Sequence, residues 1–343
     1  MNSRWLGGLS PREFLRRHWQ KRPLLVPGAL PAFRGVIGRR ELAALAMRDD
    51  VESRIVERRG RRWVTTHGPF SRRGSPKARN WTLLVGGVNL HVPAADELLR
   101  RFSFIPQARL DDVMVSYAVP GGGVGPHVDS YDVFLLQGPG RRRWKVADET
   151  YVCKAGDLLY LPPGLEHDGI ALDACTTYSI GFRAPRGAEL GAAFLDWLHE
   201  RGLPEAVYRD PRLAPAAHPA RLPPAMTAFA CGALDKIRWS RRDVEEFLGR
   251  YLSAPKAHVI FKPTRSTGPR ARLDLKTQLL YSGSRFFING ESFSLPAHDR
   301  ARMRELADRR EIDAARLARQ AKLIGEWRRA GYLHLRNTAQ RDG

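Results

Sequence analysis

A glycine-rich turn runs directly into two residues of metal-ligand type in Gly121-Gly-Gly-Val-Gly-Pro-His127-Val-Asp129. Side chains two residues apart in an extended strand point to the same side, so His127 and Asp129 are expected to share a face. Two imidazoles and one carboxylate form the facial triad of a non-haem Fe(II) site, which leaves the opposite face of the metal open for O2 and a chelating co-substrate. A second histidine, from a neighbouring strand, would complete such a triad.

That histidine ends a second stretch, Gly156-Asp-Leu-Leu-Tyr-Leu-Pro162-Pro-Gly164-Leu-Glu-His167. A His-x-Asp tripeptide alone is a weak signal, because it arises by chance in chains of ordinary composition. The two stretches together resemble the two-part signature of the cupin superfamily, in which each part is a turn that feeds a short strand carrying ligands inward. We therefore expect a β-barrel in which His127, Asp129 and His167 are the metal-binding and catalytic residues.

A cationic strand lies between the two stretches. Residues 131–137 are predicted to form an apolar core strand, and residues 141–146 (Arg-Arg-Arg-Trp-Lys-Val) form the next strand. If Trp144 faces the barrel interior, the two-residue period puts Arg142 on the same side and Arg143 outside. A buried charge is unfavourable unless it is paired, and arginine holds a carboxylate in a bidentate fork. A bound dicarboxylate would supply the partner of Arg142.

The strand predicted over residues 175–183 follows the second stretch. It is expected to place Thr177 or Ser179 near the site as a hydroxyl donor, and we assign Thr177 to co-substrate binding. Residues 185–187 (Pro-Arg-Gly) then interrupt the strand pattern. We place the end of the first domain, residues 1–185, at this point.

Amphipathic helices dominate the second predicted domain, residues 186–254. Helices are expected at 189–199, 225–238 and 241–251, with a proline-rich stretch between the first two. A small helical unit cannot bury such apolar faces alone. We therefore expect it to pack on the barrel or on a second subunit, and a homodimer is our prediction.

The third predicted domain, residues 255–343, starts with a linker over 255–272. A hairpin with strands at 279–287 and 292–295 follows, and Asn289-Gly290 is a typical tight-turn pair. Two further helices are predicted at 297–310 and 313–331. A hairpin plus helices suggests a winged-helix-like module, whose many arginines suit either a nucleic-acid face or a solvated helix surface.

The formal net charge is +21 at pH 7 over 343 residues. Such a charge attracts nucleic acid, ribonucleoprotein or other acidic surfaces, although heavy use of arginine on an ordinary surface gives the same sum. No apolar run approaches the roughly 20 residues needed to cross a bilayer, and the first residues lack the apolar core of a signal peptide. The three cysteines form no C-x-x-C motif. We expect a cytoplasmic protein with reduced thiols and no membrane contact.

Four segments carry a more specific pattern, namely residues 119–138, Gly140-Arg-Arg-Arg-Trp, Leu161-Pro-Pro-Gly and Tyr178-Ser-Ile-Gly-Phe-Arg-Ala-Pro. Together they resemble the YcfD-like bacterial ribosomal oxygenases, which are JmjC-type 2-oxoglutarate-dependent enzymes. The resemblance covers most of the chain and is close in the barrel. It implies an α+β fold with a JmjC double-stranded β-helix (a cupin barrel), a helical dimerisation unit and a C-terminal winged helix.

The resemblance also implies an activity. Its members use Fe(II), 2-oxoglutarate and O2 to hydroxylate the β-carbon of an arginine in the sixteenth protein of the large ribosomal subunit. It assigns Fe(II) to His127, Asp129 and His167, and it assigns the distal carboxylate of 2-oxoglutarate to Arg142. A basic surface would suit a substrate protein presented with ribosomal RNA. The connection over residues 147–155 is much shorter than in most members, which indicates a trimmed substrate-facing loop.

An arginine substrate needs an acidic partner for its guanidinium. Asp112, Asp132 and Asp168 are candidates by residue type and by their position beside the motifs. The residues alone do not choose among these three carboxylates.

Other functions fit the same residues. A histidyl hydroxylase or a demethylase would use the same scaffold. A cupin enzyme for a small molecule would keep the triad without needing the helical unit or the C-terminal module. A ligand-sensing regulator would use its basic C-terminus on nucleic acid and show no turnover. Formation of succinate separates an enzyme from a sensor, and a panel of substrate peptides separates the hydroxylases.

Overall fold

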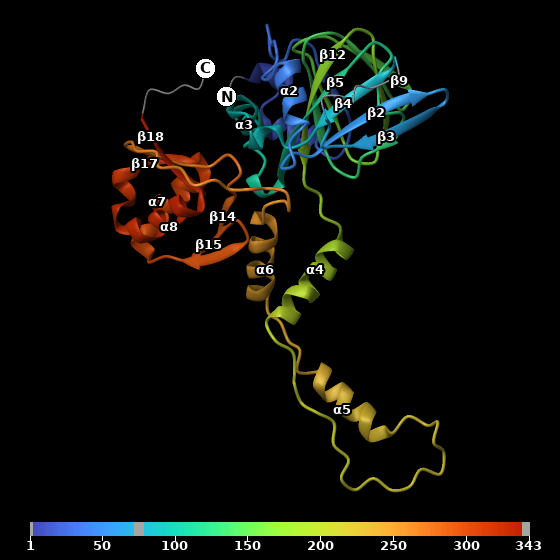
Figure 1. Ribbon diagram of the computed structural model, residues 1–343, viewed down its shortest axis with the longest axis vertical. Coiled ribbons are helices and arrows are strands. Elements are labelled where there is room, and N and C mark those ends of the chain that lie inside the picture. The colour runs from blue at the N-terminus through green and yellow to red at the C-terminus, as the bar shows by residue number, and fades with distance from the viewer. Residues whose placement is uncertain (1–2, 72–78, 338–343) are drawn as a thin grey trace.

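Two antiparallel sheets enclose one cavity and form the barrel at the top of Figure 1. The computed structural model describes residues 3–71 and 79–337. The strands are β1 Leu24–Val26, β2 Ser53–Arg59, β3 Arg62–His67, β4 Trp81–Val85, β5 Leu110–Ala118, β6 His127–Val128, β7 Val133–Gln137, β8 Arg142–Val146, β9 Glu149–Cys153, β10 Leu158–Leu161, β11 Glu166–Ala171 and β12 Cys175–Phe182. The larger sheet has the order β1-β10-β7-β12-β5-β4-β2-β3, and the smaller has the order β6-β11-β8-β9. The predicted cupin-type barrel is confirmed.

Short helices cover one face of the larger sheet. They are α1 Pro11–Arg17, α2 Arg39–Leu45 and α3 Pro93–Arg100, with 3-10 turns at Ser3–Leu6, Val88–Leu90 and Gln107–Arg109. Helix α1 begins at Pro11, because Ser10 and Glu13 form a reciprocal capping box there. Aromatic side chains fill the space between helices and sheet, and the most deeply buried are Phe14, Phe102, Phe134, Tyr160 and Phe182. This core leaves the other face of the sheet for the barrel interior.

Strand β7 is buried on both of its faces. All of its residues are buried. Phe134 and Leu136 belong to the core beneath the helices, whereas Val133 and Leu135 pack with Trp144 inside the barrel. A strand buried on both faces is apolar throughout instead of alternating, which explains the continuous apolar run in the sequence.

The connection over residues 147–155 is a tight hairpin. Strand β9 pairs directly with β8, and Val146 and Glu149 are cross-strand partners next to the turn. Ala147 has a positive φ of 49° in the turn. The chain therefore closes the smaller sheet with an edge strand here, where the sequence led us to expect a shortened loop.

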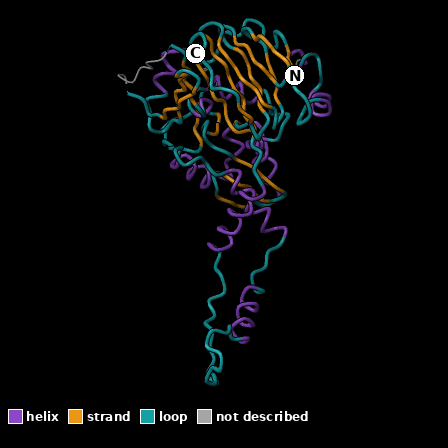
Figure 2. The backbone as a smooth tube through the Cα atoms, turned by 90° about the vertical axis from the view of Figure 1, so that its right-hand side faces the viewer, coloured by secondary structure: helices purple, strands orange, loops and turns teal. Residues whose placement is uncertain are grey.

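An extended arm follows the barrel. It contains α4 Gly187–Glu200, α5 Pro224–Leu234 and α6 Arg241–Ser253. Helices α4 and α6 pack through Phe194 and Phe247, whose ring centroids are 5.2 Å apart. The part of the chain around α5 points away from the barrel (Figures 1 and 2). Leu222 there is 77% exposed and Leu234 is 65% exposed, so these apolar side chains have no cover in a single chain.

The C-terminal module has its own core. Its strands are β13 Arg270–Leu273, β14 Leu279–Ser282, β15 Arg285–Ile288, β16 Glu291–Ser294, β17 Glu311–Asp313 and β18 Leu333–Arg336, and its helices are α7 Ala297–Arg309 and α8 Ala321–Ala330. Two three-stranded sheets, β17-β13-β18 and β14-β15-β16, pack with these helices. Phe286, Met303, Leu306 and Trp327 lie in the shared core. The predicted hairpin-plus-helix module is confirmed. Across the described ranges, no helix combines the length and the apolarity needed to span a membrane.

Three predicted elements in this module are wrong in detail. The strand predicted at 279–287 is two strands, β14 and β15, because Gly283 adopts a φ of 57° and turns the chain back. The helix predicted at 313–331 begins as a 3-10 helix, Ala314–Gln320, capped by the Asp313 side chain, before α8 starts. The predicted linker 255–272 ends in strand β13, where Ala271 is buried.

Candidate metal centre

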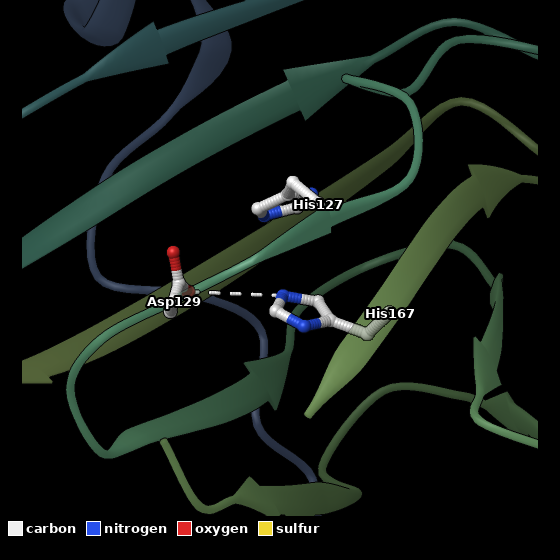
Figure 3. A group of neighbouring side chains, drawn as sticks. All are labelled: His127, Asp129 and His167. Carbon is white, nitrogen blue, oxygen red and sulfur yellow. Dashed lines mark ion pairs between the residues drawn. The ribbon is translucent and has the colours of Figure 1, made fainter. Parts of the chain in front are cut away.

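Strand register places two histidines side by side in the barrel. His127 on β6 is the direct cross-strand partner of His167 on β11, and their ring centroids lie 4.2 Å apart. Asp129 follows β6, and its Oδ2 is 3.7 Å from Nε2 of His167. One ligand atom from each residue falls within 4.8 Å of the others. Figure 3 shows the three side chains converging on one point.

Main-chain carbonyls orient both imidazoles. Nδ1 of His127 lies 2.9 Å from the carbonyl oxygen of Gly125, and Nδ1 of His167 lies 3.0 Å from that of Leu165. Because a carbonyl only accepts, Nδ1 carries the proton in each ring and Nε2 keeps its lone pair for a ligand bond. Burial, together with the neighbouring His127, lowers the pKa of His167. The neutral imidazole is the form that coordinates metal.

Glycine is required at two positions around the centre. Gly125 has a φ of +88°, and a Cβ there would lie 2.5 Å from the indole of Trp63. A Cβ on Gly169 would lie 2.5 Å from the ring of Trp144. The first glycine lets the turn pass beneath Trp63 into β6, and the second lets β11 pack over Trp144.

Arg142 lies inside the barrel with only part of its hydrogen-bonding capacity used. Its residue is 4% exposed, and its Nη1 donates a 3.4 Å bond to Oγ of Ser116. Its Nε and Nη2 are buried and, within the described chain, have no hydrogen-bond partner. Strand alternation puts Arg143 outside, as the two-residue period predicted. An unpaired fork of two donors in a buried position fits a carboxylate.

The metal centre and Arg142 line the same cavity of about 320 Å³. Three acidic residues, Glu52, Asp111 and Asp112, also line it. A second hollow of about 440 Å³ shares Asp111, Tyr131 and Lys256 with the first, so the cavity continues toward the end of α6. Such a continuation provides space for more than a small co-substrate.

The carboxylate of Asp112 is held in place by its neighbours. It accepts a 2.7 Å hydrogen bond from the main-chain N–H of Gly87. Burial raises the pKa of Asp112, and the ammonium of Lys256, 3.9 Å away, opposes that rise. Because a nearby opposite charge stabilises the ionised form of a buried acid, this part of the cavity favours a cation.

These donors fit a metal ion and an anionic co-substrate. Two imidazole nitrogens and one carboxylate oxygen on one side of a cavity match the facial triad of a non-haem Fe(II) centre. The unpaired Nε and Nη2 of Arg142 match a carboxylate of a co-substrate. The arrangement can therefore hold a redox metal and an anionic chelating partner together.

The chain is similar to known proteins. A family model described as a JmjC domain matches residues 97–155 and 149–190, and one described as a ROXA-like winged helix matches residues 236–334. The ribosomal protein uL16 3-hydroxylase of Escherichia coli is 43% identical over 275 residues, which are 73% of each chain. The chain belongs to the ribosomal oxygenase family. A probable ribosomal oxygenase of Haemophilus influenzae is 36% identical over 53% of this chain and 52% of its own length.

Solved structures of this family extend the likeness over nearly the whole chain. YcfD, a ribosomal oxygenase from Escherichia coli, superposes with a TM-score of 0.81 at 32% identity in its complex with cobalt and 2-oxoglutarate. The match covers 95% of this chain and 98% of that one. The α+β class, the JmjC barrel and the C-terminal winged helix are confirmed for this member of the family.

The structure brings only some of the predicted site residues to the cavity. Asp112 lines it. Asp132 lies on the other side of the larger sheet, fully buried, where it accepts a 2.6 Å hydrogen bond from Tyr160 and one from Gln20. Asp168 follows His167 by one residue and so points to the opposite face of β11. Thr177 donates its hydroxyl to Gln137 and is not among the cavity-lining residues.

Sequence reasoning missed several cavity residues. Ser116 projects inward from β5, and strand alternation could have found it, whereas Ser179 on β12, which we had named as an alternative to Thr177, does line the cavity. Glu52 and Lys256 come from a turn and from the segment after α6. No local pattern marks either of these two residues, because only the tertiary fold brings them to the cavity.

We predict that Co(II) raises the melting temperature of the protein through these three ligands. A metal that binds only the folded state stabilises it by about 2.7 kcal/mol at 100 times its dissociation constant, a shift on the order of 5 °C. Differential scanning calorimetry should show this shift for the wild type and for His218→Ala, but not for His167→Ala. The shift should shrink only when the pH falls below the usual imidazole range, because burial lowers the pKa of His167 and protons then compete for its ligand nitrogen. A full shift in His167→Ala would contradict the assignment.

Proposed function

We propose that the chain is a 2-oxoglutarate-dependent dioxygenase, a [50S ribosomal protein]-arginine 3-hydroxylase. Its substrate would be the sixteenth protein of the large subunit, uL16, and its target the β-carbon (C3) of an arginine. The observation that carries the proposal is the His-Asp-His group beside the unpaired, buried Arg142. The E. coli relative named as a uL16 3-hydroxylase supports the substrate, and the cobalt and 2-oxoglutarate complex of YcfD supports the cofactors.

We assign roles to the residues as follows. His127, Asp129 and His167 hold Fe(II), and Arg142 binds the distal carboxylate of 2-oxoglutarate. When bound, iron and 2-oxoglutarate supply the oxidant that transfers one atom of O2 to an unactivated C–H bond, with succinate and CO2 as co-products. The chain itself contributes position and the exclusion of water. The role of Thr177 in co-substrate binding stays a prediction, and Ser116, which already accepts from Arg142, is a further candidate.

The acidic residues of the cavity support an arginine substrate. Asp112 is fixed by the Gly87 N–H and is the candidate that faces the cavity. A guanidinium presents five donors in a planar fork and matches such a carboxylate. We propose that Asp112 accepts the guanidinium and so presents the β-carbon to the metal centre. Asp132 and Asp168 stay predictions that this geometry does not favour.

We propose the division into a catalytic domain (1–185), a helical dimerisation domain (186–254) and a winged-helix-like domain (255–343). The exposed apolar arm supports a homodimer, because Leu213, Leu222 and Leu234 are each at least 65% exposed in one chain. Patches of this kind on a folded protein mark interaction sites. A second copy of the arm would supply matching apolar surface.

The net charge of +21 supports contact with ribosomal RNA near the substrate protein. We propose that this enzyme works in the cytoplasm, where it meets ribosomal proteins. The contact should weaken with salt, since phosphate binding releases counterions. Retention of rRNA binding at high salt would argue against an electrostatic contact.

The test of the function is mass spectrometry of uL16. Purified protein, Fe(II), ascorbate, 2-oxoglutarate and uL16 should yield a product heavier by one oxygen atom on a single arginine. His127→Ala should give no product. A shift on a histidine or the loss of a methyl group would replace the arginine assignment by one of the alternatives. Consumption of 2-oxoglutarate without any modified protein would keep the chemistry and reject the substrate.

Arg142→Met should raise the KM for 2-oxoglutarate by about 10- to 100-fold, because each hydrogen bond to a charged group is worth roughly 1.5–3 kcal/mol. Arg143→Met is the matched control, since it removes the same charge from the outer face of the same strand. Its KM should stay at the wild-type value. Steady-state kinetics of succinate formation measures both variants, and equal effects at the two positions would refute a specific role for Arg142.

Leu234→Glu should shift the protein from dimer to monomer in sedimentation velocity experiments, because it places a charge in the apolar arm. Met47→Glu makes the same kind of change at an exposed apolar residue in the turn after α2 and should leave the dimer intact. A monomeric wild type at micromolar concentration would overturn the dimer proposal.

A further inference from the structure

A lysine from outside the barrel occupies the acidic part of the catalytic cavity. The Nζ atom of Lys256 lies 3.4 Å from Oδ1 of Asp111 and 3.9 Å from Oδ2 of Asp112. Glu52 lines the same part of the cavity. Burial alone would lower the pKa of Lys256, but Asp112 and Asp111 raise it above its usual value. The cation in this position is therefore a charged ammonium.

The local chain geometry delivers this lysine. Helix α6 ends at Ser253, and Ala254 leaves the helix with ψ near 132°. Pro255 follows and cannot extend a helix. Arg183 ties the helix end to the barrel, since its Nη1 donates a 2.7 Å bond to the carbonyl of Leu252. The next residue after this turn is Lys256, which points back toward the metal centre cavity.

Neither aspartate depends on Lys256 alone. Asp111 also accepts a bond from Nε of Arg183 at 3.4 Å, and Asp112 also accepts the N–H of Gly87 at 2.7 Å. The side chain of Lys256 is 35% exposed, so its ammonium can reach water by rotation of its own side chain. If Lys256 moves away, each carboxylate therefore keeps another hydrogen-bond donor.

We propose that Lys256 occupies the place of the substrate's guanidinium in the free enzyme and that the substrate arginine displaces it. The inference rests on the proposed arginine hydroxylase function and adds a competition step to it. Like charges close together in a buried site repel. While no substrate is bound, the ammonium of Lys256 offsets this repulsion between the carboxylates of Asp111 and Asp112. The exchange swaps one cation for another, so the net charge of the cavity stays constant.

The exchange favours arginine for a geometric reason. An ammonium is a compact, strongly hydrated point charge, whereas a guanidinium is planar, more weakly hydrated and able to bind a carboxylate through two donors. Lys256 returns to water on displacement and regains its hydration. A neutral side chain cannot make this exchange, because it brings no positive charge to replace that of the Lys256 ammonium beside the two aspartates. Asp111 and Asp112 thus select for a cationic substrate side chain, and Lys256 sets how tightly that cation binds.

The test compares two peptides from the substrate protein, one with the target arginine and one with the neutral isostere citrulline. In Lys256→Met the arginine peptide no longer competes with an ammonium. Its dissociation constant and its KM should fall about two- to fivefold, the upper part of the range for loss of a partly exposed ion pair. The kcat and the KM for 2-oxoglutarate should stay at wild-type values. Calorimetric titration of the full-length protein gives the dissociation constants, and succinate formation gives the kinetics.

Two matched variants complete the design. Lys256→Arg keeps the charge and should bind the arginine peptide no more tightly than the wild type. Lys262→Met removes an exposed lysine from the same segment and should change nothing. Weaker binding of the arginine peptide to Lys256→Met would show that Lys256 assists the substrate, and an equal change for both peptides would show a purely structural role. Either result overturns the inference.

The outcomes also separate this inference from the function on which it rests. If the wild type hydroxylates no arginine peptide and no uL16, the proposed function fails. If the wild type is active and Lys256→Met leaves the arginine peptide's binding unchanged, only the displacement by substrate fails. Melting temperatures of all variants, measured beside the wild type, identify any loss of folding.

Discussion

The direct pairing of His127 with His167 across β6 and β11 is the constraint on which the rest of the site depends. In a sheet with a side-chain period of two, a slip by one residue would send one imidazole to the outer face. Val146 and Trp144 on β8, through their pairing with β11, hold this register from the other side. The glycine at position 169 permits that packing, because no larger residue fits against the indole. The metal centre is therefore a property of the smaller sheet as a whole.

The buried charge of Arg142 is the second determinant. A guanidinium enclosed between two sheets is unfavourable unless an anion accompanies it. The only hydrogen bond that its described surroundings supply is a long one to Ser116. The folded barrel thus holds the unpaired guanidinium donors of Arg142 at a fixed place relative to the metal ligands, where a carboxylate can accept from them. This placement, more than the size of the cavity, favours a dicarboxylate co-substrate over a neutral one.

Sequence reasoning predicted what local periodicity controls. The ligand trio, the inward direction of Arg142 and most strands follow from turns and two-residue alternation, which act over short stretches. The C-terminal hairpin was drawn too long, because a single glycine at 283 reverses the chain inside an otherwise continuous apolar pattern. The acidic candidates could not be separated, since Asp112, Asp132 and Asp168 differ only in which face of the folded sheets they occupy. Lys256 lay in a predicted linker, and the bond from Arg183 to the last turn of α6 brings it to the cavity.

The bond from Arg183 to the last turn of α6 has a consequence for the whole assembly. The same guanidinium contacts the main chain of the helix at Leu252 and the carboxylate of Asp111 at the cavity. A shift of α6 that breaks one contact therefore alters the electrostatic potential at the other. Binding equilibria coupled in this way are reciprocal. A subunit that docks on the arm and moves α6 would change substrate affinity, and a bound substrate would change the free energy of subunit docking by the same amount.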